Sequence, residues 1–159
     1  MAELFVNFES RPLMPLLEEM LLYWRGLGKD GRLPGRQDLE PAKITNILPW
    51  MLILDVVPGG GEYRFKFRLF GTGLVERAGR ELTGLWFEEA FPEDEQQAYF
   101  VEGVNRVVRE KQPIGFYGHS MIKDRKHLRV VGLILPLADD GETVDRIISV
   151  NLRQEVDGE

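Results

Sequence analysis

The two histidines, His119 and His127, are the residues of this chain with the widest range of possible chemistry. A metal or haem site would need at least one of them together with further ligands. If the hairpin between them turns at 124–125, His119 lies opposite Val130 and the two imidazoles point to opposite faces of the sheet. We therefore predict no shared metal site. His119 alone stays a candidate for ligand binding, for acid–base chemistry, or for holding a haem as its single protein ligand.

Three other patterns imitate catalytic sites and have simpler interpretations. Ser120 adjoins His119, but neighbours on a strand point to opposite faces, so the two form no nucleophile–base pair. The Gly-Thr-Gly loop at 71–73 has Glu76 where a dinucleotide-binding loop has its third glycine. An acidic run is typical of a solvated helix start, where carboxylates offset the helix dipole; it comprises Glu88, Glu89, Glu93, Asp94 and Glu95. We predict no catalytic residue.

The composition is that of a folded domain rather than a disordered chain, with 159 residues of which 43% are hydrophobic and 29% charged. The net charge of −6 argues against nucleic-acid binding, because phosphate neutralisation needs surplus cations. The absence of cysteine excludes disulfides, Cys-ligated zinc, iron–sulfur clusters and a flavin–cysteine adduct. No export signal or membrane-spanning run is visible, so we expect a cytoplasmic protein that does not bind membranes.

The first element to position any site is an amphipathic helix over 13–27, where apolar residues recur every three or four positions. Met14, Leu22 and Tyr23 widen its apolar face beyond the stripe that a surface helix normally buries. The chain's own sheet is one candidate to cover this face, and we predict that a second copy covers the remainder. The predicted homodimer interface comprises Leu17, Met20, Leu21, Tyr23 and Trp24.

The remaining elements are a short helix over 39–47, strands over 50–57 and 63–70, a helical insert ending in a longer helix over 92–110, and strands over 114–122, 128–137 and 144–153. Within 63–70, aromatic and apolar side chains alternate with Arg64, Lys66 and Arg68, which predicts a strand with one cationic, solvated face. This order favours an α+β fold, a five-stranded antiparallel sheet with helices on one face. We assign 1–37 to a flanking helix and basic loop, and 38–159 to the main domain.

A series of local motifs runs through the first half of the chain: Tyr23-Trp24, Leu33-Pro34-Gly35-Arg36, Asp38-Leu39-Glu40-Pro41, Ile47-Leu48-Pro49, Phe67-Arg68-Leu69-Phe70-Gly71-Thr72 and Glu81-Leu82-Thr83-Gly84. Together with the order of the elements, this series resembles the PAS domain. It is most similar to a bacterial single-domain PAS group formerly catalogued as a domain of unknown function. The second half of the chain fits by element order alone.

The resemblance implies a sensory or regulatory module with a small-molecule pocket between sheet and helical insert, which signals to a partner protein through dimer or helix geometry. It identifies no ligand or cofactor. The side chains that we expect at the pocket are Trp86, Phe87, Tyr99, Phe116, Tyr117, His119 and Asn151. Two other classes stay open: a small enzyme that uses His119 with a carboxylate as its acid–base pair, and a structural adaptor with a filled core and no ligand.

Overall fold

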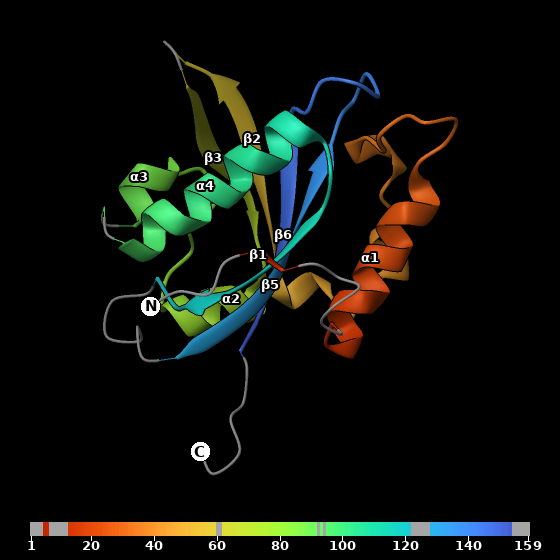
Figure 1. Ribbon diagram of the computed structural model, residues 1–159. Coiled ribbons are helices and arrows are strands. Elements are labelled where there is room, and N and C mark those ends of the chain that lie inside the picture. The colour runs from red at the N-terminus through yellow and green to blue at the C-terminus, as the bar shows by residue number, and fades with distance from the viewer. Residues whose placement is uncertain are drawn as a thin grey trace.

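An antiparallel sheet separates two layers of helices in the computed structural model, which describes residues 5–6, 13–59, 62–91, 93, 95–121 and 128–153 (Figure 1). Five strands form the predicted sheet: β2 (Met51–Pro58), β3 (Tyr63–Phe70), β4 (Ile114–His119), β5 (Arg129–Leu137) and β6 (Arg146–Arg153). The strand order is β1-β4-β5-β6-β2-β3, and every pairing is antiparallel. The predicted α+β architecture is confirmed. The short edge strand β1 (Phe5–Val6), which pairs with β4, was not predicted.

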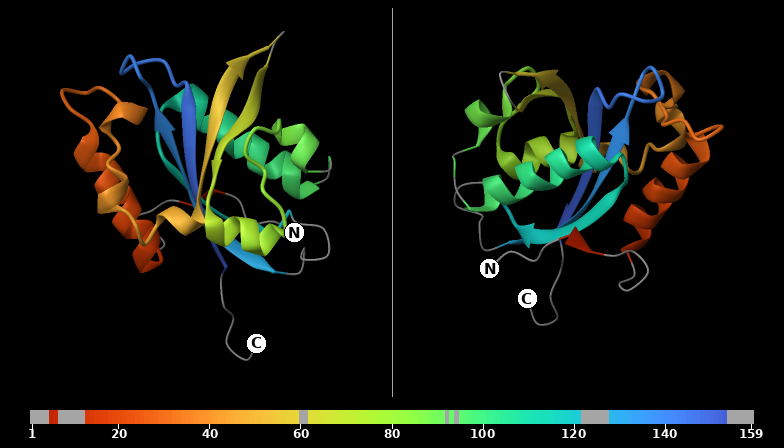
Figure 2. Two further views of the ribbon diagram at one scale, coloured as in Figure 1. Left: turned by 180° about the vertical axis from the view of Figure 1, so that it is seen from behind. Right: turned by 45° about the horizontal axis from the view of Figure 1, so that its top comes forward.

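The helices divide between the two faces of the sheet. The helix α1 (Pro15–Leu27) lies on one side, whereas α2 (Thr72–Ala78), α3 (Phe87–Ala90) and α4 (Glu95–Glu110) lie on the other (Figure 2). We call the face toward α2–α4 the inner face and the face toward α1 the outer face. Each face has its own hydrophobic cluster, so the sheet is buried on both sides.

The apolar face of α1 packs on the outer face of the chain's own sheet. Leu17, Met20, Leu21 and Trp24 are at most 8% exposed and share a cluster with strands β2, β5 and β6. Four of the residues predicted at a dimer interface are therefore core residues of a single chain, and a second copy is not needed to cover them. The fifth, Tyr23, is half-buried, and its hydroxyl accepts a hydrogen bond from the backbone N–H of Glu40 (2.8 Å).

Trp24 of α1 also supplies a hydrogen-bond donor to the part of β5 that extends past β4. Consecutive strand residues direct their backbone groups to opposite neighbours, and Leu137 O accepts a bond from the Asp145 N–H on the β6 side. Pro136 therefore faces the β4 side, beyond Ile134, the last β5 residue paired with β4. Its missing N–H leaves no gap in the ladder there. Its carbonyl accepts a bond from Trp24 Nε1 (2.8 Å).

The strand β3 departs from the expected alternation at one point. Ile53 pairs with Leu69 but Leu54 pairs with Phe67, so Arg68 is an extra residue in a β-bulge. The bulge moves Leu69 to the outer face, where it is 36% exposed, and directs Phe70 into the inner cluster. The alternation expected over 63–70 would place Leu69 on the buried side with Phe65 and Phe67, and it fails at Leu69 because a strict two-residue period cannot include a bulge.

Other predicted boundaries also shift. The short helix expected over 39–47 is not continuous: within that range lies the 3-10 turn η2 (Pro41–Lys43), and the 3-10 turns η1 (Arg36–Asp38) and η3 (Leu48–Trp50) flank it. The long helix begins at Glu95. His119 pairs with Arg129 and not with Val130, so the predicted β4–β5 register was wrong by one residue. The expected turn at 123–126 and His127 lie outside the described residues.

Candidate functional site

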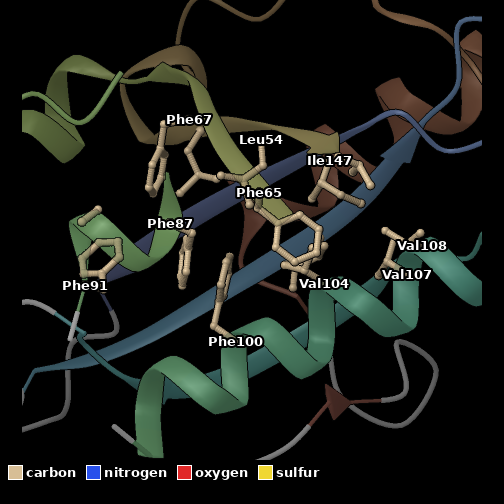
Figure 3. Packing of buried hydrophobic residues seen from close by; sticks show 14 of the residues in the cluster. Leu54, Phe65, Phe67, Phe87, Phe91, Phe100, Val104, Val107, Val108 and Ile147 are labelled. Atoms are coloured by element: carbon tan, nitrogen blue, oxygen red, sulfur yellow. The ribbon is translucent and has the colours of Figure 1, made fainter. Parts of the chain in front are cut away.

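The inner core is built around a run of phenylalanine rings that ends at a cavity. Phe87 stacks between Phe67 and Phe100, with ring centroids 5.7 and 5.6 Å away (Figure 3). Phe100 meets Phe116 edge-on at 5.7 Å. Such aromatic contacts contribute about 0.5–1.5 kcal/mol each beyond simple burial, so this run stabilises the packing of the inner face beside the cavity.

The cavity lies between the inner face and helices α2 and α4, and its volume is about 80 Å³. A single water molecule needs only about 10–15 Å³ on this measure, so the space exceeds an ordinary packing defect. Its walls are mainly apolar, with a few polar side chains. The bordering residues are Leu52, Phe70, Leu74, Arg77, Phe91, Gln96, Tyr99, Phe100, Phe116, Tyr117, Gly118, His119, Ser120, Met121, Val130 and Asn151.

Five of the seven side chains predicted at a pocket belong to residues that border this cavity: Tyr99, Phe116, Tyr117, His119 and Asn151. Phe116 and Asn151 are on the inner face, because both pair with Gly132 across β4, β5 and β6. Tyr117 packs against the outer cluster as well, as expected for the next residue along the strand. The inner-face residues are therefore the better candidates for ligand contact.

The structure places Trp86 and Phe87 elsewhere, which corrects the sequence-based assignment. Trp86 lies beside β3, where the Arg64 guanidinium carbon is 3.8 Å from the centroid of its ring and Lys66 also approaches it. Phe87 is buried in the aromatic run, and its ring stacks on the Phe100 ring. The error has a physical cause, since an aromatic-rich stretch does not show which of its rings pack against each other and which border a space.

Gly132 is a further determinant of the cavity that the sequence analysis missed. A Cβ atom at this position would lie 2.2 Å from Cζ of Phe116 and 2.9 Å from the Val150 carbonyl oxygen. Glycine therefore makes room for the Phe116 ring, which forms part of the cavity wall. A lone glycine inside an apolar strand does signal such a close approach, although it does not say to what.

Arg77, Gln96 and Asn151 supply polar groups at the cavity. Gln96 Oε1 accepts a bond from the His119 backbone N–H (3.3 Å), which ties α4 to the end of β4. Asn151 Nδ2 donates to Ser149 Oγ (3.1 Å) on the same strand. Arg77 comes from α2, and its Nη1 donates a long bond to the Asn151 carbonyl oxygen (3.5 Å). Neither Arg77 nor Gln96 was predicted at the pocket.

The described residues around His119 do not form the acid–base pair considered from the sequence. The residue across the sheet is Arg129, a cation, and no carboxylate bonded to His119 is found in the described part of the chain. Ser120 comes directly after the end of β4, and its backbone N–H donates to the Leu128 carbonyl oxygen. No group of three or more potential metal ligands occurs among the residues that the structure describes. The arrangement gives no specific support to the enzymatic alternative.

The cationic surface positions are largely matched by nearby acceptors. Arg64 pairs with Glu88, and Arg68 pairs with Asp55 (2.9 Å), which also binds Arg146 (3.2 Å). The basic loop is tied down in the same way, since Arg32 donates to the Asp140 carbonyl oxygen. Within the described ranges, no helix has the length and hydropathy that crossing a membrane requires.

Comparisons with known proteins give matches at the level of structure and of family. No curated protein matches the chain. A solved structure from work on a flavin analogue and the light-oxygen-voltage domain mechanism is similar, with 15% identity, a TM-score of 0.49, and coverage of 73% of this chain and 84% of that one. A family model described as PAS domain (PAS_5) matches residues 14–151, from α1 into β6. The chain therefore belongs to the PAS domain family, whose members are typically sensory modules.

Proposed function

We propose that the chain is a sensory module that binds a small organic ligand in the cavity and passes the resulting change to α1. The observation that carries this proposal is the cavity itself, a space of about 80 Å³ beside an otherwise closely packed aromatic core. Binding pockets combine mainly apolar walls with a few polar groups, and this lining fits that description. A structural adaptor with a filled core, the alternative considered from the sequence, would not show such a space.

The sheet offers a short route from the cavity to α1. On β6, Asn151 borders the cavity, whereas its neighbours Val150 and Leu152 pack in the outer cluster with α1. On β4, Phe116 and Tyr117 form a similar pair. A ligand that favours one position of these strands also favours one packing of α1, and it shifts the balance only by its differential affinity for the two states.

The output of such a shift is a change in the exposed surface of α1, read by a second copy or by another protein. Two large apolar side chains at α1 stay exposed, Leu22 at 60% and Met14 at 37%. We keep the homodimer as a proposal, with its interface moved from the buried face of α1 to this exposed side.

Native mass spectrometry of the freshly purified chain tests ligand binding. We expect a non-covalent adduct of a small organic molecule, and we expect it to be lost in Leu74→Phe, which places a larger side chain in the cavity wall. Leu69→Phe is the matched control, because Leu69 lies on the outer face. An adduct that survives Leu74→Phe unchanged would contradict binding in this cavity, as would absence of binding to any compound in a broad metabolite screen.

A further inference from the structure

Arg77 is a cation beside a cavity whose lining is mainly apolar. It projects from α2, is half-buried, and borders the apolar cavity. Its guanidinium carbon lies 5.3 Å from the centroid of the Trp50 ring, and its Nη1 makes the 3.5 Å bond to the Asn151 carbonyl oxygen. A guanidinium carries five N–H donors, and among the residues that the structure describes Arg77 makes this one hydrogen bond and this one ring contact.

No ion pair between Arg77 and a carboxylate is found in the part of the chain that the structure describes. The nearby charge is that of Arg153, a second cation. Burial, and then the charge of Arg153, lower the pKa of Arg77 from its ordinary value. Charges withdrawn from water are normally paired, so the position calls for an anion that the described chain does not provide.

The position of Arg77 is built into the fold. Gly73 and Arg77 are four residues apart, so they lie on one side of α2, and both face Trp50. A Cβ atom on Gly73 would lie 2.6 Å from the Trp50 ring. Glycine at this position thus lets α2 approach Trp50 closely, and the contact holds Arg77 at the cavity.

The other walls of the cavity indicate the size and polarity of the uncharged part of the ligand. Phe100 and Phe116 form an apolar wall from α4 and β4, and Leu74 adds to it from α2. A volume of about 80 Å³ is small beside the roughly 300–1,000 Å³ of pockets for drug-sized ligands. The space suits a single ring or a short chain. One permanently charged side chain among the described lining residues suits a single negative charge.

We propose that the ligand is a small organic monoanion, a carboxylate on a ring or short apolar chain, whose carboxylate pairs with Arg77 and whose apolar body packs against Phe100 and Phe116. The planar guanidinium matches a carboxylate in a two-point arrangement. This inference rests on the proposed ligand-binding function and adds the chemical class of the ligand to it.

Two acid–amide pairs separate the charge from the apolar body: phenylacetate with phenylacetamide, and hexanoate with hexanamide. Each probe is titrated into the full chain while backbone amide resonances are followed by NMR. We expect at least one acid to shift resonances of cavity residues and to bind about 10- to 100-fold more tightly than its amide, the range for one charge-assisted hydrogen-bonded contact. Arg77→Met should remove that preference, and Arg77→Lys should keep part of it.

Arg106→Met is the matched control, because Arg106 is an exposed cation on α4 that pairs with Glu110 outside the cavity. It removes the same charge and should leave the preference unchanged. The dispersion of the amide spectrum shows that each variant is folded. Equal binding of acids and amides, or a preference that survives Arg77→Met, would overturn the inference and leave ligand binding intact. If no probe of either charge shifts a cavity resonance, the ligand-binding proposal fails together with the inference.

Discussion

Replacing Trp24 by phenylalanine tests how α1 is held on the sheet. The change keeps an aromatic ring in the outer cluster and removes the donor that binds the Pro136 carbonyl (2.8 Å). Trp24 is 8% exposed, so water has little access to this carbonyl. Leaving a buried acceptor without a partner costs about 1–3 kcal/mol. The free energy of unfolding should fall by that amount.

Urea unfolding followed by far-UV circular dichroism measures the change, because ellipticity does not depend on the number of tryptophans. For a domain of this size, each kcal/mol corresponds to a shift in melting temperature of about 2–4 °C. Trp86→Phe is the control, since Trp86 lies beside β3 against Arg64 and Lys66, and it should cost less than about 1 kcal/mol. Equal losses in the two variants, or no loss in Trp24→Phe, would refute the reasoning that this indole completes β5.

Four further expectations follow from other contacts. Gly132→Ala should destabilise the protein by about 1–3 kcal/mol, because its Cβ collides with Phe116; an unchanged melting temperature would show that the ring moves freely. Burial raises the pKa of Asp145, so its destabilising charge is absent below the unfolded-state pKa and develops as pH rises through the folded-state pKa. Asp145→Asn should therefore raise the melting temperature near pH 7 more than near pH 3, and the opposite trend would contradict this sign. Asp55→Asn should cost more stability than Glu88→Gln in denaturant titrations, because the Asp55 side chain is 18% exposed and holds two arginines; equal losses would count against the network. Sedimentation at micromolar concentration should show a dimer that Leu22→Glu dissociates, and a stable wild-type monomer would refute the proposed interface.

Much of the fold was predictable from local patterns. The period-two segments and the turns between them identify the five strands, and the apolar period from 13 to 27 identifies α1. What packs against the apolar face of α1 was not predictable, because an apolar helix face can pack equally well on the chain's own sheet or on a second copy. The bulge at Arg68 was missed for a related reason, since it is a property of the β2–β3 pairing and not of one strand.

The site was predicted less completely than the fold. Phe116 and Asn151 were correctly expected at the pocket, because aromatic and polar residues on the sheet were considered together with the helical insert. Arg77 escaped notice because an arginine on a short helix is usually solvated. Its burial depends on the contact between Gly73 and Trp50, which are far apart in the predicted elements. The four-residue spacing of Gly73 and Arg77 is visible in the sequence and places both on one side of α2. It predicts a buried Arg77 only if one knows that this side packs against Trp50.

A high-resolution crystal structure of the freshly purified chain is the most direct test of whether the space between sheet and helices accepts a small molecule. We expect that space to persist and to contain electron density for a small organic acid, with its charged end at Arg77 and its body against Phe100 and Phe116. A structure in which the chain's own side chains fill the space completely would contradict the central claim.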